Sequence, residues 1–262
     1  MDFTTSDHIR LNLRQYGSGQ PVIMIHGFSG CQAIWTEQIR PFVNHGFQVI
    51  TYDQRNHGAS ELDENLTEID RLVTDLKEIV EQVCNEKPIL IGHSMGAAVT
   101  YGMLEQNAHL LKGVIAIDES PKMIENTNWH YGFMHATRAN YKEKMRQLPH
   151  IRQTLHGVTP ECRKQVKAEN QQFPFDWQAN EELLYSHVRR DWRQFLIDTM
   201  LPVLMVTANQ SPFFDGEYAK VMQAQNPEHL HRRAIDQTGH CVMAEQPAKF
   251  NQTAFEFIST LK

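Results

Sequence analysis

The sequence predicts an α/β fold in which helices flank a mostly parallel central sheet, with a helical segment inserted into the chain. Three observations lead to this prediction. Short, continuous apolar runs recur along the chain, and stretches with helical periodicity lie between them. A long stretch between residues 120 and 195 lacks such runs and differs in charge from the remainder. Strands that alternate with helices are typical of parallel sheets covered on both faces.

The predicted strands are apolar runs bounded by turn residues. They occupy residues 22–25, 49–52, 89–91, 114–117 and 203–206. Continuous runs indicate strands that are buried on both faces. Residues 9–14 instead alternate apolar and polar side chains, which predicts an antiparallel edge strand. Residues 230–235 are a further strand candidate.

Two helices have the clearest patterns. Apolar residues between 66 and 83 recur with a period of 3.6 and form one stripe. Asn65, with Glu68 three residues later, predicts an N-cap and its capping partner. After Pro247, apolar residues at helical spacing predict a helix at the C-terminal end of the chain.

Residues 120–195 predict a helical cap inserted into a core formed by residues 1–119 and 196–262. From residue 121 to 195 there are 12 Lys or Arg and 8 Asp or Glu, a net charge of +4, whereas the whole chain carries −6. Aromatic residues are also frequent in this stretch. The change in composition therefore marks a segment distinct from the predicted sheet.

The composition excludes several classes of protein. With 262 residues and 41% hydrophobic residues, the chain suits one large domain or one domain with an insertion. A net charge of −6 argues against nucleic acid as a partner. No apolar run reaches the ~18–20 residues of a membrane span, and no signal peptide is expected. Four scattered cysteines predict reduced thiols and a cytoplasmic location.

A candidate nucleophile lies in the motif Gly-His-Ser-Met-Gly at residues 92–96. The motif follows the apolar run 89–91 and precedes a helical pattern. A turn of this kind forces its central residue into a strained conformation that exposes the side-chain hydroxyl above the sheet. Ser94 is therefore the predicted nucleophile, and His93 is interpreted as a support residue.

Together with two loops, this motif resembles the α/β-hydrolase superfamily, and among its members the esterase-like serine hydrolases with a helical cap. Residues 26–28, His-Gly-Phe, resemble the oxyanion loop of that family, and residues 53–60 resemble its Asp-x-Arg-x-His-Gly-x-Ser loop. The resemblance extends over nearly the whole chain. It implies that the backbone N–H groups of Phe28 and Met95 form the oxyanion hole.

Three side chains in these two loops are interpreted as structural supports. His26 is expected to brace the oxyanion loop. His57 and Arg55 are expected to satisfy buried backbone carbonyls in the second loop.

The remaining catalytic residues are less evident from the sequence. His240 is the predicted general base, because it follows the strand candidate 230–235 and precedes the last helix. Ser211 occupies the position where the family usually has its acid. Asp118, at the end of the run 114–117, is the preferred acid, as in certain haloalkane dehalogenases. Asp215 is the alternative.

The predicted activity is hydrolysis of a carboxylic ester of a small, apolar substrate through an acyl-enzyme intermediate. Trp129, Phe133 and Met134 are expected to line the substrate pocket. Hydrolysis of a thioester, a lactone or a carbon–carbon bond, and perhydrolysis, use the same residues and stay open as alternatives. A slow-turnover ligand sensor that signals to a partner protein is a further alternative. No metal or cofactor is expected, and the sequence does not indicate an oligomeric state.

Overall fold

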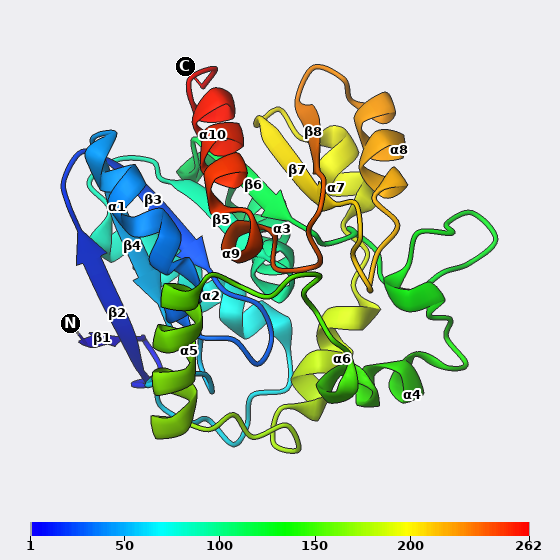
Figure 1. The fold of residues 1–262 in the computed structure, drawn as a ribbon, viewed down its shortest axis with the longest axis horizontal. Coiled ribbons are helices and arrows are strands. Elements are labelled where there is room, and N and C mark those ends of the chain that lie inside the picture. The colour runs from blue at the N-terminus through cyan, green and yellow to red at the C-terminus, as the bar shows by residue number, and fades with distance from the viewer. Residues whose placement is uncertain (1, 262) are drawn as a thin grey trace.

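The computed structural model describes residues 2–261, and an eight-stranded sheet lies at its centre (Figure 1). The strand order is β1-β2-β4-β3-β5-β6-β7-β8. The strands are β1 (Asp2–Thr4), β2 (Arg10–Tyr16), β3 (Gln20–Ile25), β4 (Phe47–Tyr52), β5 (Ile89–His93), β6 (Gly113–Ile117), β7 (Val203–Ala208) and β8 (Leu230–Ile235). The strands β3 to β8 are parallel, whereas β1 and β2 pair antiparallel. The predicted α/β fold with a mostly parallel sheet is thus confirmed.

Helices cover both faces of this sheet (Figure 1). The α-helices are α1 (Thr36–Asn44), α2 (Ile69–Val83), α3 (Met95–Asn107), α4 (Tyr141–Arg146), α5 (Pro160–Gln172), α6 (Glu181–Arg189), α7 (Arg193–Asp198), α8 (Glu217–Gln225), α9 (Val242–Glu245) and α10 (Pro247–Ile258). The 3₁₀ helices are η1 (Gln32–Trp35), η2 (Ala108–Leu110), η3 (Phe133–His135) and η4 (Leu148–His150).

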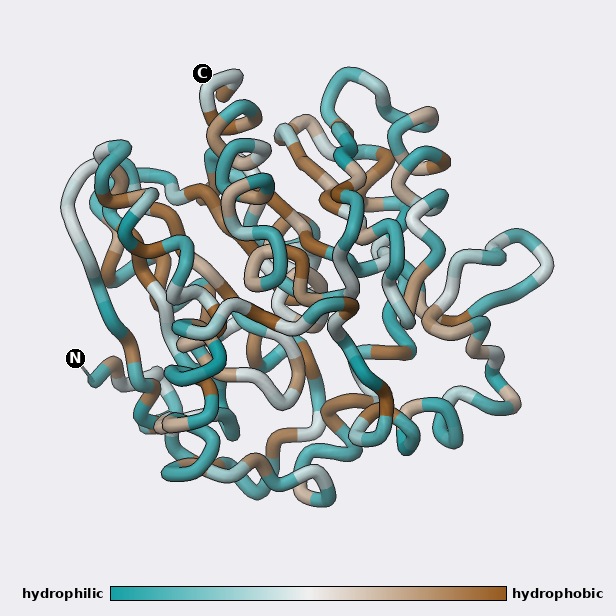
Figure 2. The backbone as a smooth tube through the Cα atoms, viewed as in Figure 1, coloured by the Kyte–Doolittle hydropathy of each residue, from teal (hydrophilic) through white to brown (hydrophobic). Residues whose placement is uncertain are grey.

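Two apolar cores lie on opposite faces of the sheet because successive side chains of a strand point to opposite sides. Leu90 packs in the core that includes α2 and α3. Its neighbours in β5, Ile89 and Ile91, pack in the core that includes α1 and α10. Figure 2 shows the hydrophobic residues concentrated in the central strands and the hydrophilic ones in the outer loops. No helix among residues 2–261 is long and apolar enough to cross a membrane.

Two local predictions differ from the structure. The strand β2 is not the edge, because β1 pairs along its outer side. The helix α2 begins at Ile69 with Glu68 as its N-cap, so the predicted N-cap Asn65 is wrong. Ser186 in α6 explains this start, because its hydroxyl accepts the Ile69 N–H (3.1 Å) and donates to Glu68 (2.5 Å). A contact from a distant helix therefore replaces the local capping pair.

The segment 120–195 contains η3, α4, η4, α5, α6 and the first turn of α7. Among residues 2–261, its only β pairing consists of two isolated bridges, Lys122 with Asp191 and Asn126 with Trp129. In Figure 1, α4 and α6 lie together, while α5 stands apart from them and close to α1. The helix α7 crosses residue 195, so the predicted boundary falls inside a helix.

Candidate active site

Ser94 lies on a sharp turn between β5 and α3 and is half-buried. Its backbone has φ 53° and ψ −126°, a strained conformation for a residue with a side chain. The flanking glycines make the turn possible. A Cβ on Gly92 would come within 2.4 Å of the Gly96 carbonyl oxygen, and one on Gly96 within 2.2 Å of the Ile25 carbonyl oxygen. The predicted strand–turn–helix context of Ser94 is therefore present.

Two backbone amides lie beside this turn and are available to an anion. Met95 is the first residue of α3, where a helix leaves its N–H without an acceptor. The N–H of Phe28 likewise donates to no acceptor among residues 2–261. The loop of Phe28 lies against the serine, since a Cβ on Gly27 would be 3.0 Å from Ser94 Cβ. These are the two amides that the family resemblance implies for an oxyanion hole.

His26 holds this loop in place. Its Nε2 accepts the Gln54 N–H (3.0 Å), so its Nδ1 carries the proton and donates to the Gly27 carbonyl (2.8 Å). The Gln54 side chain in turn donates to the His26 carbonyl (2.7 Å). Burial lowers the pKa of His26, which keeps the ring neutral. Both ring nitrogens are engaged, so His26 acts as a brace.

His240 and Asp118 form a buried hydrogen-bonded pair. The Nδ1–H of His240 donates to Asp118 Oδ2 at 2.7 Å. That oxygen also accepts the Ser211 hydroxyl (2.6 Å), and Asp118 Oδ1 accepts the Ala208 N–H (3.1 Å). Because the proton is held on Nδ1, His240 Nε2 is left as an acceptor. The predicted hydrogen bond between Asp118 and His240 is present.

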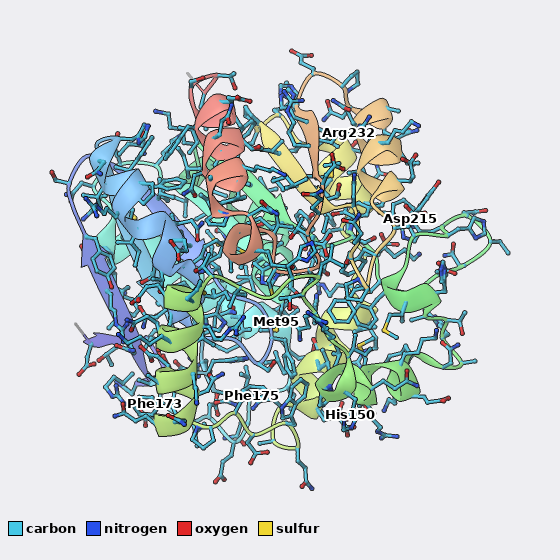
Figure 3. The ribbon with its side chains drawn as sticks, in the orientation of Figure 1. Met95, His150, Phe173, Phe175, Asp215 and Arg232 are labelled. Atoms are coloured by element: carbon cyan, nitrogen blue, oxygen red, sulfur yellow. The ribbon has the colours of Figure 1, made fainter. Side chains whose placement is uncertain are left out.

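Asp215, the alternative acid, lies elsewhere. It is exposed, and its carboxylate accepts the Glu217 N–H (3.0 Å) at the start of α8. Figure 3 shows Asp215 well separated from Met95, which marks the turn at Ser94. The contact with Glu217 is local to the start of α8, whose N-cap is Gly216.

Neighbouring rings fix the orientation of the His240 imidazole. The Phe213 ring meets it edge-on with centroids 4.7 Å apart, and the His93 ring is 4.5 Å away. His93 Nε2–H donates to the His240 carbonyl (3.0 Å), and burial lowers the pKa of His93 well below its ordinary value. A neutral, buried His93 therefore holds the loop of His240, in keeping with its predicted role as a support.

A small cavity of about 40 Å³ joins Ser94 to His240. Its lining is largely apolar. The lining residues are Gly27, Phe28, Ser29, His93, Ser94, Met123, Phe133, Leu148, Gln153, Trp177, Leu184, His187, Phe213 and His240. Of the three predicted pocket residues, only Phe133 takes part.

Trp129 and Met134 lie outside this cavity. The indole N–H of Trp129 donates to the Lys122 carbonyl (2.9 Å), and the Arg193 guanidinium covers its ring. Met134 packs against the apolar core that includes α2 and α3, and its N–H donates to the Phe213 carbonyl. Both residues thus stabilise the segment 120–195 and its contact with the core.

The sequence reasoning missed a second buried histidine–carboxylate pair at this cavity. His187, in α6, bonds through Nε2 to Glu119 Oε1 at 3.0 Å, and both side chains are almost completely buried. Glu119 directly follows Asp118 at the end of β6. That adjacency was the signal in the sequence, because polar residues at the carboxyl ends of parallel strands gather at one edge of the sheet.

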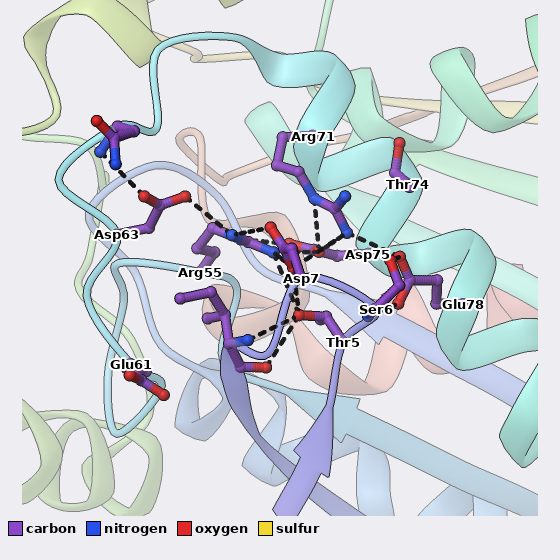
Figure 4. Close-up of polar contacts among 12 residues, drawn as sticks. Thr5, Ser6, Asp7, Arg55, Glu61, Asp63, Arg71, Thr74, Asp75 and Glu78 are labelled. Atoms are coloured by element: carbon purple, nitrogen blue, oxygen red, sulfur yellow. Dashed lines mark hydrogen bonds and ion pairs between the residues drawn. The ribbon is translucent and has the colours of Figure 1, made fainter.

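Arg55 anchors the second family loop to α2 and to the N-terminal segment (Figure 4). Its buried guanidinium pairs with Asp7, Asp63 and Asp75 at 2.8 Å each. The prediction that Arg55 satisfies backbone carbonyls is therefore wrong, because three carboxylates occupy its donors. The hydrogen bond from Arg55 holds the pKa of Asp7 well below its usual range. His57 does bond a carbonyl, that of Arg55 (2.8 Å).

No cluster of three or more His, Cys, Asp or Glu suited to a metal ion occurs within residues 2–261.

Comparisons with known proteins show what this chain is similar to. The chain is 25% identical over 253 residues to the sn-1-specific diacylglycerol lipase ABHD11 of Xenopus laevis, covering 92% of this chain and 80% of that protein. The structure of this chain resembles that of an esterase of Exiguobacterium antarcticum, with a TM-score of 0.82, 18% identity and 99% of both chains covered. A bromoperoxidase of Bacillus anthracis also gives a TM-score of 0.82, at 18% identity, covering 99% of this chain and 100% of that one.

The family assignment rests on a match over most of the sequence. The model of the Alpha/beta hydrolase family matches residues 22–253. The matched range includes the turn at Ser94, the loop of Phe28, and both His240 and Asp118. The chain belongs to the alpha/beta hydrolase family.

Proposed function

We propose that the protein hydrolyses carboxylic esters through an acyl-enzyme intermediate. Ser94 is the nucleophile, His240 the general base and Asp118 the acid that orients it. The observation that carries the proposal is the 2.7 Å hydrogen bond from His240 to Asp118, which leaves His240 Nε2 as an acceptor at the cavity of Ser94. The ester-hydrolysing relatives support this choice of bond.

The reaction proceeds in two halves. His240 Nε2 takes the proton of the Ser94 hydroxyl as its oxygen attacks the ester carbonyl. The N–H groups of Phe28 and Met95 stabilise the negative oxygen that develops. The tetrahedral intermediate then collapses, and His240 returns the proton to the departing alcohol. A water molecule attacks the acyl-enzyme by the same route and releases the acid.

The cavity supports a small, apolar acyl group. Its volume of about 40 Å³ is tight, and Phe133, Leu148, Leu184 and Phe213 form much of its wall. Three of these four side chains come from the segment 120–195, which we propose to be a cap over a core of residues 1–119 and 196–262. The cap would therefore set the length of the acyl group.

A labelling and turnover experiment tests this function. The wild-type protein is assayed with 4-nitrophenyl esters from acetate to octanoate, and we expect the shortest chains to react fastest. Ser94→Ala should lower kcat by roughly 10⁴-fold or more, because the covalent route disappears. A fluorophosphonate should label the wild type and the matched variant Ser29→Ala, whose serine lines the same cavity, but not Ser94→Ala.

Two outcomes would contradict the proposal. Labelling of Ser94→Ala at the wild-type rate would remove Ser94 as the nucleophile. A single burst that ends in a stable adduct would instead indicate a slow-turnover sensor. Thioesters and lactones in the same panel show whether another acyl bond is the better substrate.

A further inference from the structure

A second, much larger cavity of about 640 Å³ lies next to the small one. The helix α5 forms one wall, with side chains at the spacing of a single helix face. They are Arg163, Val166, Lys167, Asn170 and Gln171. The loop of residues 26–31, together with Ile34, forms another part of the lining. We call this cavity the α5 groove.

The α5 groove and the small cavity share part of their lining. Gly27, Phe28, Ser29, His93 and Gln153 border both of them. Ser94 and His240 line the small cavity, whereas the groove is bordered by the shared residues and by α5. The groove therefore borders the place where an ester carbonyl would meet Ser94.

The charged side chains that line the groove have one sign. Arg163 and Lys167 line it, and no carboxylate does. Neither side chain forms an ion pair with a carboxylate among residues 2–261. Glu169, on the same helix, is paired with Arg14 at 2.6 Å. Arg163 and Lys167 therefore have no ion-pair partner among residues 2–261.

The other ionisable groups of the lining are neutral near pH 7. Burial raises the pKa of both the Cys31 and Cys241 thiols to about 12. Burial also lowers the pKa of His26 and His93, so neither ring is charged. Arg163 and Lys167 are thus the charged side chains of the lining, while Ile34, Val158 and Val166 make part of the wall apolar.

We infer that the α5 groove binds an apolar arm of the ester substrate that ends in an anionic group, a carboxylate or a phosphate. The inference rests on the proposed function, because it places the ester bond at Ser94. The volume of the groove lies within the range of sites that hold small molecules, about 300–1,000 Å³. The substrate class is then an ester with one short, apolar side at Ser94 and one longer, anionic side.

Matched pairs of esters test this inference. For an anionic acyl arm, mono-4-nitrophenyl adipate is compared with its neutral methyl ester. For an anionic alcohol arm, 6-acetoxyhexanoate and 6-acetoxyhexyl phosphate are compared with hexyl acetate. Each exposed ion pair strengthens binding by a few-fold. Two ion pairs should therefore raise kcat/KM by roughly tenfold for the anionic ester relative to its neutral counterpart in at least one of these comparisons. Added salt should reduce this preference.

Variants assign the preference to the groove. Arg163→Gln/Lys167→Gln should abolish the preference by raising KM for the anionic ester roughly tenfold more than KM for the neutral ester. Lys164→Gln/Lys249→Gln removes the same charge from outside the groove and should keep the preference. Equal rates for charged and neutral esters in the wild type, or a preference that survives in the Arg163/Lys167 double variant, would overturn the inference.

A binding measurement separates this inference from the proposed function. Amides are resistant analogues of the same esters, so calorimetric binding of 6-acetamidohexanoate and N-hexylacetamide needs no turnover. If no ester is hydrolysed, the proposed function falls. The inference about the groove is then tested by binding alone, and equal affinity for the two amides overturns that inference. Tighter binding of the anionic amide, lost in the Arg163/Lys167 double variant, supports it.

Discussion

Replacing Asp118 by Asn tests the acid of the proposed triad with the smallest possible change in shape. Asp118 Oδ1 accepts the Ala208 N–H, so the amide oxygen of Asn takes this position. In the wild type, Asp118 Oδ2 accepts hydrogen bonds from both Ser211 and His240. In the variant, the amide NH₂ of Asn takes the place of this oxygen and faces the same two residues. An NH₂ group donates to His240 Nδ1 and drives the ring proton to Nε2. In that tautomer His240 cannot accept the proton of Ser94.

The size of the effect follows from the charge that is lost. In the transition state the imidazolium of His240 has a buried carboxylate 2.7 Å away from its Nδ1. Charge centres about 4 Å apart interact by about 4 kcal/mol at an effective dielectric constant near 20. At 1.36 kcal/mol for each factor of ten, this amounts to about 10³-fold in kcat. The wrong tautomer adds to the loss, so we expect roughly 10³–10⁴-fold.

The assay compares steady-state kcat and KM of Asp118→Asn and Asp215→Asn with a short 4-nitrophenyl ester. Asp215→Asn is the matched control, because the hydrogen bond of this exposed carboxylate is local to the start of α8. Its kcat should stay within a few-fold of the wild type, and both variants should show wild-type circular dichroism. The reasoning is refuted if folded Asp118→Asn keeps more than a tenth of the wild-type kcat, or if Asp215→Asn is the more damaged variant.

Two further predictions concern stability and specificity. Burial lowers the pKa of His57 to about 3, so the unfolded chain binds a proton below pH 6.5 that the folded protein does not. Between pH 7 and pH 4.5 the protonation of His57 in the unfolded chain should therefore lower the free energy of unfolding by roughly 2–3 kcal/mol. In urea unfolding, the free energy of unfolding of His57→Asn should fall by that much less than the free energy of the wild type. An equal fall in both proteins would contradict the role of His57 in this pH dependence. Phe133→Ala should shift the preference toward longer acyl chains by enlarging the cavity at Ser94, whereas Trp129→Phe should leave the chain-length profile unchanged.

The sheet was predictable from the sequence because its strands are buried on both faces. Every continuous apolar run lies in a strand, from β3 to β7, and residues 230–235 form β8. The short strand β1 escaped prediction, since three residues carry too little periodicity to be recognised. The start of α2 escaped for another reason. Its first N–H is satisfied by Ser186, which is 117 residues away in the chain.

The site was predictable where local geometry dictates the residues. The turn at Ser94 needs glycine at 92 and 96 because backbone atoms fill the space of a side chain there. The pocket was less predictable, because aromatic side chains of the segment 120–195 look alike in sequence. Packing alone decides that Phe133 faces the cavity while Trp129 faces Arg193. The α5 groove is likewise formed by elements that are far apart in the chain.

The proposed acid, Asp118, lies at the end of β6, beside the end of β7. The ends of β6 and β7 are adjacent, and the Asp118 N–H donates to the Val206 carbonyl (2.7 Å). A carboxylate on either strand can therefore reach the loop of His240. Ser211, where the family usually has its acid, now donates its hydroxyl to Asp118. The carboxylate at the end of β6 thus makes the hydrogen bond to His240, and the hydroxyl of Ser211 after β7 supports that carboxylate.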